Sequence, residues 1–98
     1  MGNVKNLCQE LDKILSEINS SGFSKVPPVT MEKLEKISSD AAGIGMKAGK
    51  GLIDNFITVL KAFLAGTANE ASVSLRFTAL DFYKKNVLDG QSDSEEEL

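Results

Sequence analysis

The number of helices in this chain depends on one short segment, Gly43-Ile44-Gly45-Met46-Lys47-Ala48-Gly49-Lys50-Gly51. Four of its nine residues are glycine, although helix-forming sequence lies on both sides. A glycine inside a helix costs roughly 1 kcal/mol relative to alanine, so four glycines so close together need a physical reason. Three reasons are available: a hinge between two helices, a close contact between two helix backbones, or a cradle for an anion.

The hinge and the close contact predict different folds. A hinge predicts four helices in the domain. Close contact predicts three, with residues 31–65 forming one long, kinked helix. In that helix small residues recur every four positions and form a smooth groove against which another helix can pack. The residues of this predicted partner-binding groove are Ala41, Gly45 and Gly49.

The anion cradle assumes that a helix begins at Leu52, just after the last glycine. Free amides at that helix start, together with two lysines, could hold a phosphate or a carboxylate. The predicted anion-binding residues are Lys47, Gly49, Lys50 and Gly51. A nucleotide-hydrolysing phosphate loop is not supported, because Ile44 stands where its first glycine belongs and Gly51 where its hydroxyl residue belongs.

The first half of the chain has the spacing of amphipathic helices. Between Val4 and Ile18 apolar residues recur every three or four positions, which predicts a helix that Asn3 caps and that residues 19–22 end. Pro27 and Pro28 interrupt helical structure, and Phe23 and Val26 in this connection are expected to cover the core. Thr30 is the expected N-cap of the next helix.

The second half predicts two further helices. Residues 52–65 have a wide apolar side, typical of a helix with several neighbours, and Gly66 ends it. Thr67 and Glu70 have the spacing of a capping box for a last helix that runs to about Leu88. Residues 73–78 alternate like a strand, but no second alternating segment could pair with them, so we expect helix there.

Two apolar rows run along this last helix. One contains Leu75, Ala79 and Phe82, and the other contains Val73, Phe77, Leu80, Lys84 and Val87. Together with the stripes on the other helices they provide more apolar surface than a minimal bundle needs, so one row is expected to face a partner. We expect the outward residues to be Val73, Phe77 and Leu80.

Composition argues against catalysis. Histidine is absent from the 98 residues, which removes the commonest general base and metal ligand, so we expect neither a metal nor a cofactor. Cys8, the single cysteine, lies on an apolar stripe and is expected to be a buried structural thiol. Thiol chemistry at Cys8 is the enzymatic alternative.

Charge is concentrated at the C-terminus. Four of the 14 acidic residues lie between Ser92 and Leu98, which leaves ten acids against eleven bases in the rest of the chain. A nearly neutral body argues against nucleic-acid binding. Residues 90–98 are expected to be a disordered acidic tail, in which Ser92 and Ser94 match an acidophilic kinase pattern; a solubilising tail is the simpler interpretation.

These observations predict one all-α domain over residues 1–89, a small antiparallel helical bundle. The N-terminus lacks the apolar run of a signal peptide, and the chain lacks an apolar stretch long enough to cross a membrane, so we expect a cytoplasmic protein. The predicted function is a non-enzymatic interaction module that binds another protein or itself. The alternative is a module that binds anions or a membrane surface through residues 43–51.

Overall fold

The computed structural model describes residues 3–89, and the described chain forms a bundle of four α-helices with no strand. The helices are α1 (Asn3–Ser21), α2 (Pro28–Gly43), α3 (Lys47–Leu64) and α4 (Glu70–Leu88). A 3-10 helix, η1 (Phe23–Lys25), lies between α1 and α2. The four-helix prediction is confirmed and the three-helix alternative is wrong. Residues 73–78 lie inside α4, so their alternation is not that of a strand.

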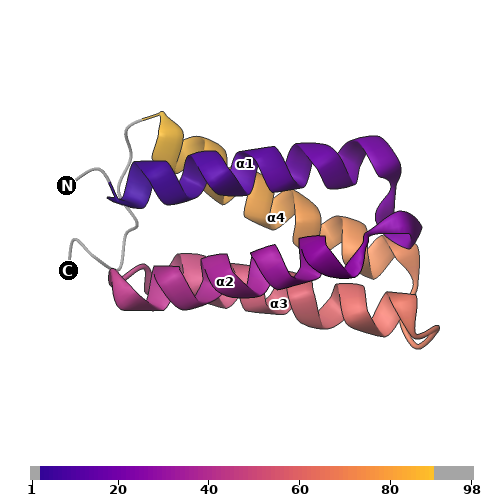
Figure 1. Ribbon diagram of the computed structural model, residues 1–98. Helices are drawn as coiled ribbons and strands as arrows, with labels where there is room; N and C mark the ends of the chain where they lie inside the picture. The colour runs from indigo at the N-terminus through magenta and orange to yellow at the C-terminus, as the bar shows by residue number, and fades with distance from the viewer. Residues whose placement is uncertain (1–2, 90–98) are drawn as a thin grey trace.

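Consecutive helices pack side by side, and α1 also packs against α4 (Figure 1). The start of α1, the α2–α3 turn and the end of α4 lie at one end of the bundle. Helix η1 and the α3–α4 connection lie at the other end. The four helices therefore enclose a single hydrophobic core that runs along the bundle.

The core is built from the apolar stripe of each helix. Leu11 of α1, Leu34 of α2, Phe56 of α3 and Leu80 of α4 are all essentially inaccessible to solvent. Burying a side chain of this size contributes about 1.5–3 kcal/mol relative to leaving it in water. Packing of these four stripes is therefore the main source of stability in the bundle.

Three phenylalanines close the η1 end of this core. Phe23 packs edge-on against Phe77, with ring centroids 5.5 Å apart, and against Phe56 at 6.5 Å. Phe56 and Phe77 are 5.8 Å apart in the same geometry, which aromatic rings favour. Phe23 is half-buried and Val26 is buried, so the prediction that this connection covers the core is confirmed.

The starts of α2 and α4 differ from those expected. Helix α2 begins at Pro28, which suits a first helical position because its missing N–H needs no partner there; Thr30 is buried within the first turn instead of capping it. Helix α4 is capped by Asn69, whose Oδ1 accepts a hydrogen bond from the Ser72 amide at 2.9 Å. The predicted capping box is therefore wrong, and Thr67 donates its hydroxyl to the Ala62 carbonyl at the end of α3.

The α2–α3 turn occupies only residues 44–46 of the glycine segment. Gly45 adopts a φ of 84°, a left-handed conformation that side chains other than glycine rarely adopt. Helix α3 starts directly afterwards at Lys47, five residues before the predicted start at Leu52. The hinge interpretation is thus confirmed, but the hinge is shorter than the glycine segment. The predictions for the acidic tail, with Ser92 and Ser94, fall outside the described residues.

Candidate interaction surfaces

The outer side of α4 exposes two large apolar side chains. Leu75 and Phe82 are each 66% exposed, the highest values among the large hydrophobic residues that the structure describes as exposed. They are seven residues, or about two helical turns, apart, so one lies above the other on the same side of the helix. The residues that share this outer face of α4 are Ala71, Leu75, Thr78, Ala79, Phe82 and Asn86.

None of these six residues is charged, and the charged residues of α4 lie to either side of them. By the helical repeat, Arg76 lies along one edge of the outer face, and Glu70 and Lys85 lie along the other. All three are exposed. The outer face of α4 is therefore an uncharged strip with charged borders, the pattern of a helix surface that packs on a partner.

The inner side of α4 carries the other apolar row and one lysine. Lys84 has a side chain only 5% exposed, and its Nζ lies 2.5 Å from Asp12 Oδ1 of α1 and 3.0 Å from Asp81 Oδ1. Burial lowers the pKa of Lys84, but the hydrogen bonds to the two carboxylates outweigh it and hold the pKa above its ordinary value. The charged amine thereby joins α4 to α1.

The predicted outward residues of α4 lie on this inner side. Val73 and Leu80 are completely buried, and Phe77 is half-buried in the phenylalanine cluster. The expectation that these residues face outward is therefore wrong, because their row makes up the core face of the helix. The row of Leu75, Ala79 and Phe82, which the sequence periodicity also indicates, is the one that faces outward. The length of each row is the signal that distinguishes the two sides of α4, because the longer row fills the core.

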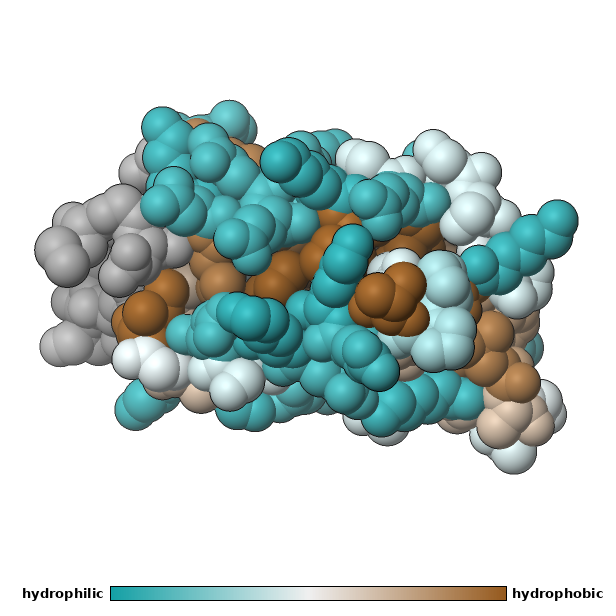
Figure 2. Space-filling view, viewed as in Figure 1, coloured by the Kyte–Doolittle hydropathy of each residue, from teal (hydrophilic) through white to brown (hydrophobic). Residues whose placement is uncertain are grey.

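A groove follows the seam between α1 and α2. Figure 2 shows a hydrophobic strip along this seam with hydrophilic side chains on both borders. Its middle part encloses about 290 Å³. It is lined by Glu10, Lys13, Ile14, Glu17, Lys33, Lys36 and Ile37.

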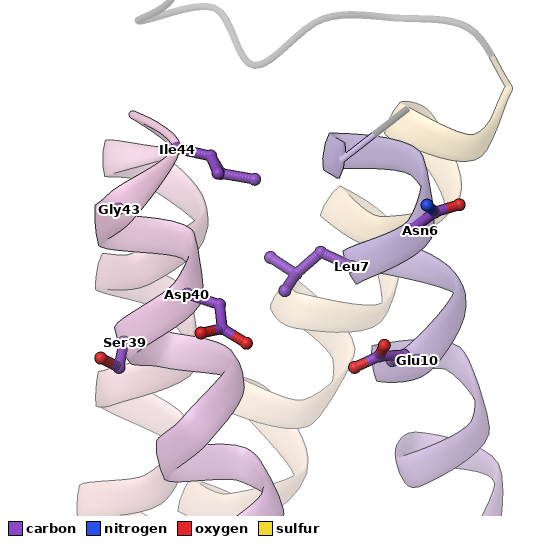
Figure 3. A pocket seen from close by; sticks show the side chains of 7 residues that line it. All are labelled: Asn6, Leu7, Glu10, Ser39, Asp40, Gly43 and Ile44. Atoms are coloured by element: carbon purple, nitrogen blue, oxygen red, sulfur yellow. The ribbon is translucent and has the colours of Figure 1, made fainter. Parts of the chain in front are cut away.

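The groove continues to the end of the bundle, where it encloses about 490 Å³ (Figure 3). Leu7 and Ile44 point toward each other across it, and the carboxylates of Glu10 and Asp40 approach it from opposite helices. The floor of the groove is already filled, because Leu7, Ile14 and Ile37 are no more than 7% exposed. It offers less uncovered apolar surface than the outer face of α4.

The predicted small-residue groove does not form, because the chain turns between its members. Ala41 is buried in α2, Gly45 is exposed in the turn, and Gly49 is buried in α3. Gly49 does serve a close contact, but with a side chain: a Cβ there would lie 2.7 Å from the Tyr83 hydroxyl of α4. The close-packing interpretation of the glycines thus applies at Gly49 alone.

The predicted anion-binding residues are distributed around the start of α3. The amide of Lys47 donates to the Gly45 carbonyl at 3.0 Å, and the Lys50 amide donates to the Met46 carbonyl at 2.9 Å. Lys50 Nζ lies 2.5 Å from Asp54 Oδ2, and this bond, with a second from Ser38, holds the pKa of Asp54 below its ordinary value. Lys47 and Gly51 are exposed. Amides and a lysine that the cradle would use are thus engaged within the protein.

Cys8 is inaccessible to solvent in the core, as predicted. Residues 3–89 contain no group of three or more histidine, cysteine or carboxylate side chains arranged to hold a metal ion. Within the same range no helix combines the length and the apolar character needed to cross a membrane.

Among known proteins, no family model matches the chain, and neither a curated protein nor a solved structure is significantly similar to it.

Proposed function

We propose that this chain is a non-enzymatic helical interaction module that binds a partner, either another protein or a second copy of itself, through the outer face of α4. The observation that carries the proposal is the exposure of Leu75 and Phe82, two large apolar side chains on one uncharged helix face. Covering them would contribute on the order of 1–2 kcal/mol each, since both are two-thirds exposed and full burial is worth about 1.5–3 kcal/mol.

The distribution of apolar residues in α4 supports this choice of surface. Its inner row already supplies the core with Val73, Leu80 and Val87, so the outer row adds nothing to the packing of the bundle. Two other large hydrophobic side chains are exposed in the described chain, Val29 at 54% and Leu64 at 43%. They lie on different helices, near the start of α2 and at the end of α3, and do not form a row along one helix.

The shape of the surface indicates the class of partner. A straight, uncharged strip on one helix is complementary to a second helix with an apolar face, which packs on it by inserting side chains between those of the first. We also infer that consecutive helices of the bundle run antiparallel, because the connections alternate between its two ends (Figure 1). In such a bundle α4 has two helical neighbours, and its outer side is left for a third.

Site-specific photo-cross-linking in the cells from which the chain comes tests this proposal. A cross-linking side chain replaces Thr78, in the middle of the outer face of α4. A matched control replaces Asn55, which is exposed on α3. We expect a discrete covalent product with a protein from position 78, no such product from position 55, and loss of the product on adding Phe82→Ser. Equal labelling from both positions, or a product that survives Phe82→Ser, would contradict the proposal.

A further inference from the structure

We propose that the partner of the outer face of α4 is a second copy of the same face, packed antiparallel about a two-fold axis that passes between Thr78 and Ala79. This inference rests on the proposed function and names its partner. A two-fold interface requires a surface that is complementary to itself. The outer face of α4 meets that requirement in both side-chain size and charge.

The sizes of the side chains read the same from either direction. Along the face the order is Leu75, Thr78, Ala79, Phe82, which is large, small, small, large. When two such helices are antiparallel and centred between Thr78 and Ala79, Leu75 of each copy meets the partner's Phe82. The two small residues lie where the helices are closest, and they allow the large side chains on either side to interlock.

The charges along the edge of the face favour the antiparallel direction. Glu70 and Lys85 are exposed on the same edge, near opposite ends of α4. In the antiparallel register Lys85 lies at the level of the partner's Ser72, about half a turn from the partner's Glu70, and the reverse contact forms at the other end. Lys85, which also bonds Asp81 of its own helix at 3.1 Å, therefore approaches the partner's Glu70 at both ends of the pair.

A parallel two-fold pair would bring none of the three residues Glu70, Arg76 and Lys85 to the level of an opposite charge. Each edge of one helix would face the opposite edge of the partner, so Glu70 would lie about six residues, or roughly 9 Å along the axis, from the level of the partner's Arg76. In the antiparallel pair the two Arg76 residues are displaced by about five residues along the axis, or roughly 7–8 Å. Since the antiparallel pair brings opposite charges to nearly the same level and the parallel pair does not, charge favours the antiparallel arrangement.

The size of the face sets the strength of the association. Helix α4 has 19 residues and is about 28 Å long, and one face of it offers less than the roughly 1,200 Å² of total buried area typical of stable complexes. We therefore expect a reversible dimer that forms at high protein concentration and dissociates on dilution. The exposed Leu75 and Phe82 belong to the dissociated chain.

Disulfide trapping of two single-cysteine variants tests both the partner and the register. In the proposed register Ala71 faces the partner's Asn86, whereas Ala71 and the partner's Ala71 are about 15 residues, or roughly 22 Å, apart along the axis. The variants are Ala71→Cys and Asn86→Cys, with Asn55→Cys on α3 as the control. Cys8 is inaccessible to solvent and does not compete for oxidation.

Mixing the two variants at high concentration under mild oxidation is expected to give a disulfide-linked heterodimer, while each variant alone gives no more dimer than Asn55→Cys. Adding Leu75→Ser to both should lower the heterodimer to the control level, without loss of helical content, because Leu75 is exposed. Homodimers of Ala71→Cys or of Asn86→Cys would overturn the antiparallel register. No dimer above the control in any mixture would overturn self-association.

The two proposals fail separately. If no disulfide forms here but position 78 still cross-links to a protein in cells, a different protein occupies the outer face of α4 and only the second-copy inference is wrong. If both experiments give nothing, the outer face of α4 is not a docking surface. A disulfide-linked heterodimer together with a cellular product of twice the chain's mass would support both.

Discussion

Helices α3 and α4 have almost the same length, 18 and 19 residues, but they place their apolar residues differently. The buried residues of α3, such as Ile53, Phe56 and Leu60, share one side with half-buried neighbours. Helix α4 divides its large apolar residues between a buried inner row and an exposed outer row. The arrangement in α3 is explained by packing within the bundle alone, whereas the outer row of α4 calls for a further contact.

The largest expected effect separates the two rows of α4. Leu80→Ala removes a completely buried side chain and should lower the free energy of unfolding by about 2–5 kcal/mol, through lost burial and the cavity left behind. Leu75→Ala on the outer row should change it by less than about 0.5 kcal/mol. Denaturant unfolding of both variants at low protein concentration measures the difference. A similar cost at both positions would mean that the outer row is part of the folded core.

The next effect concerns the lysine on the inner row. Asp81→Asn removes a carboxylate that bonds Lys84 at 3.0 Å and Lys85 at 3.1 Å, and should cost about 1–3 kcal/mol near neutral pH. Asp40→Asn is the control, because the Lys36–Asp40 pair is exposed and such pairs contribute at most about 1 kcal/mol.

The cost of Asp81→Asn should depend on pH in a defined direction. Burial raises the pKa of Asp81, but the bonds from Lys84 and Lys85 outweigh it and leave the pKa below its ordinary 3.8. The stabilisation is therefore present above pH 3.8 and is lost as the pH falls through the lower pKa of the folded state. Unfolding curves of the wild type and Asp81→Asn should converge in strong acid. A constant difference across this range would contradict the ionic role of Asp81.

The smallest effect compares two glycines of α3. Gly51→Ala should raise the free energy of unfolding by about 0.5–1 kcal/mol, because its Cβ would meet no atom within 4 Å and alanine favours helix. Gly49→Ala should gain less or become destabilising, since the Tyr83 hydroxyl must move from its position over α3. Thermal unfolding of both variants measures this. Equal stabilisation would show that Tyr83 moves aside without cost and that the α3–α4 contact does not depend on glycine.

Much of the architecture could be predicted from local sequence. The apolar periodicity of α1, the proline break before α2 and the glycine after α3 are signals that act over a few residues, so the number of helices followed once the glycine segment was taken as a hinge. The starts of α2, α3 and α4 were predicted less well. Several residues near each of these starts could cap the helix, and tertiary packing decides which one does. Thr30 is buried and does not cap α2, and Asn69 caps α4 in place of Thr67.

Only part of the candidate interaction surface on α4 could be predicted from the sequence. The local sequence by itself determined that α4 carries two apolar rows and that four glycines interrupt a helical region, because both features depend only on neighbouring residues. Which row faces inward was decided by tertiary structure. One of the two carboxylates that hold Lys84 in the core belongs to Asp12 of α1, 72 residues earlier in the chain. Gly49 is needed only because Tyr83 packs over it from α4. Contacts between residues so distant in sequence depend on how the helices assemble, and no local pattern encodes them.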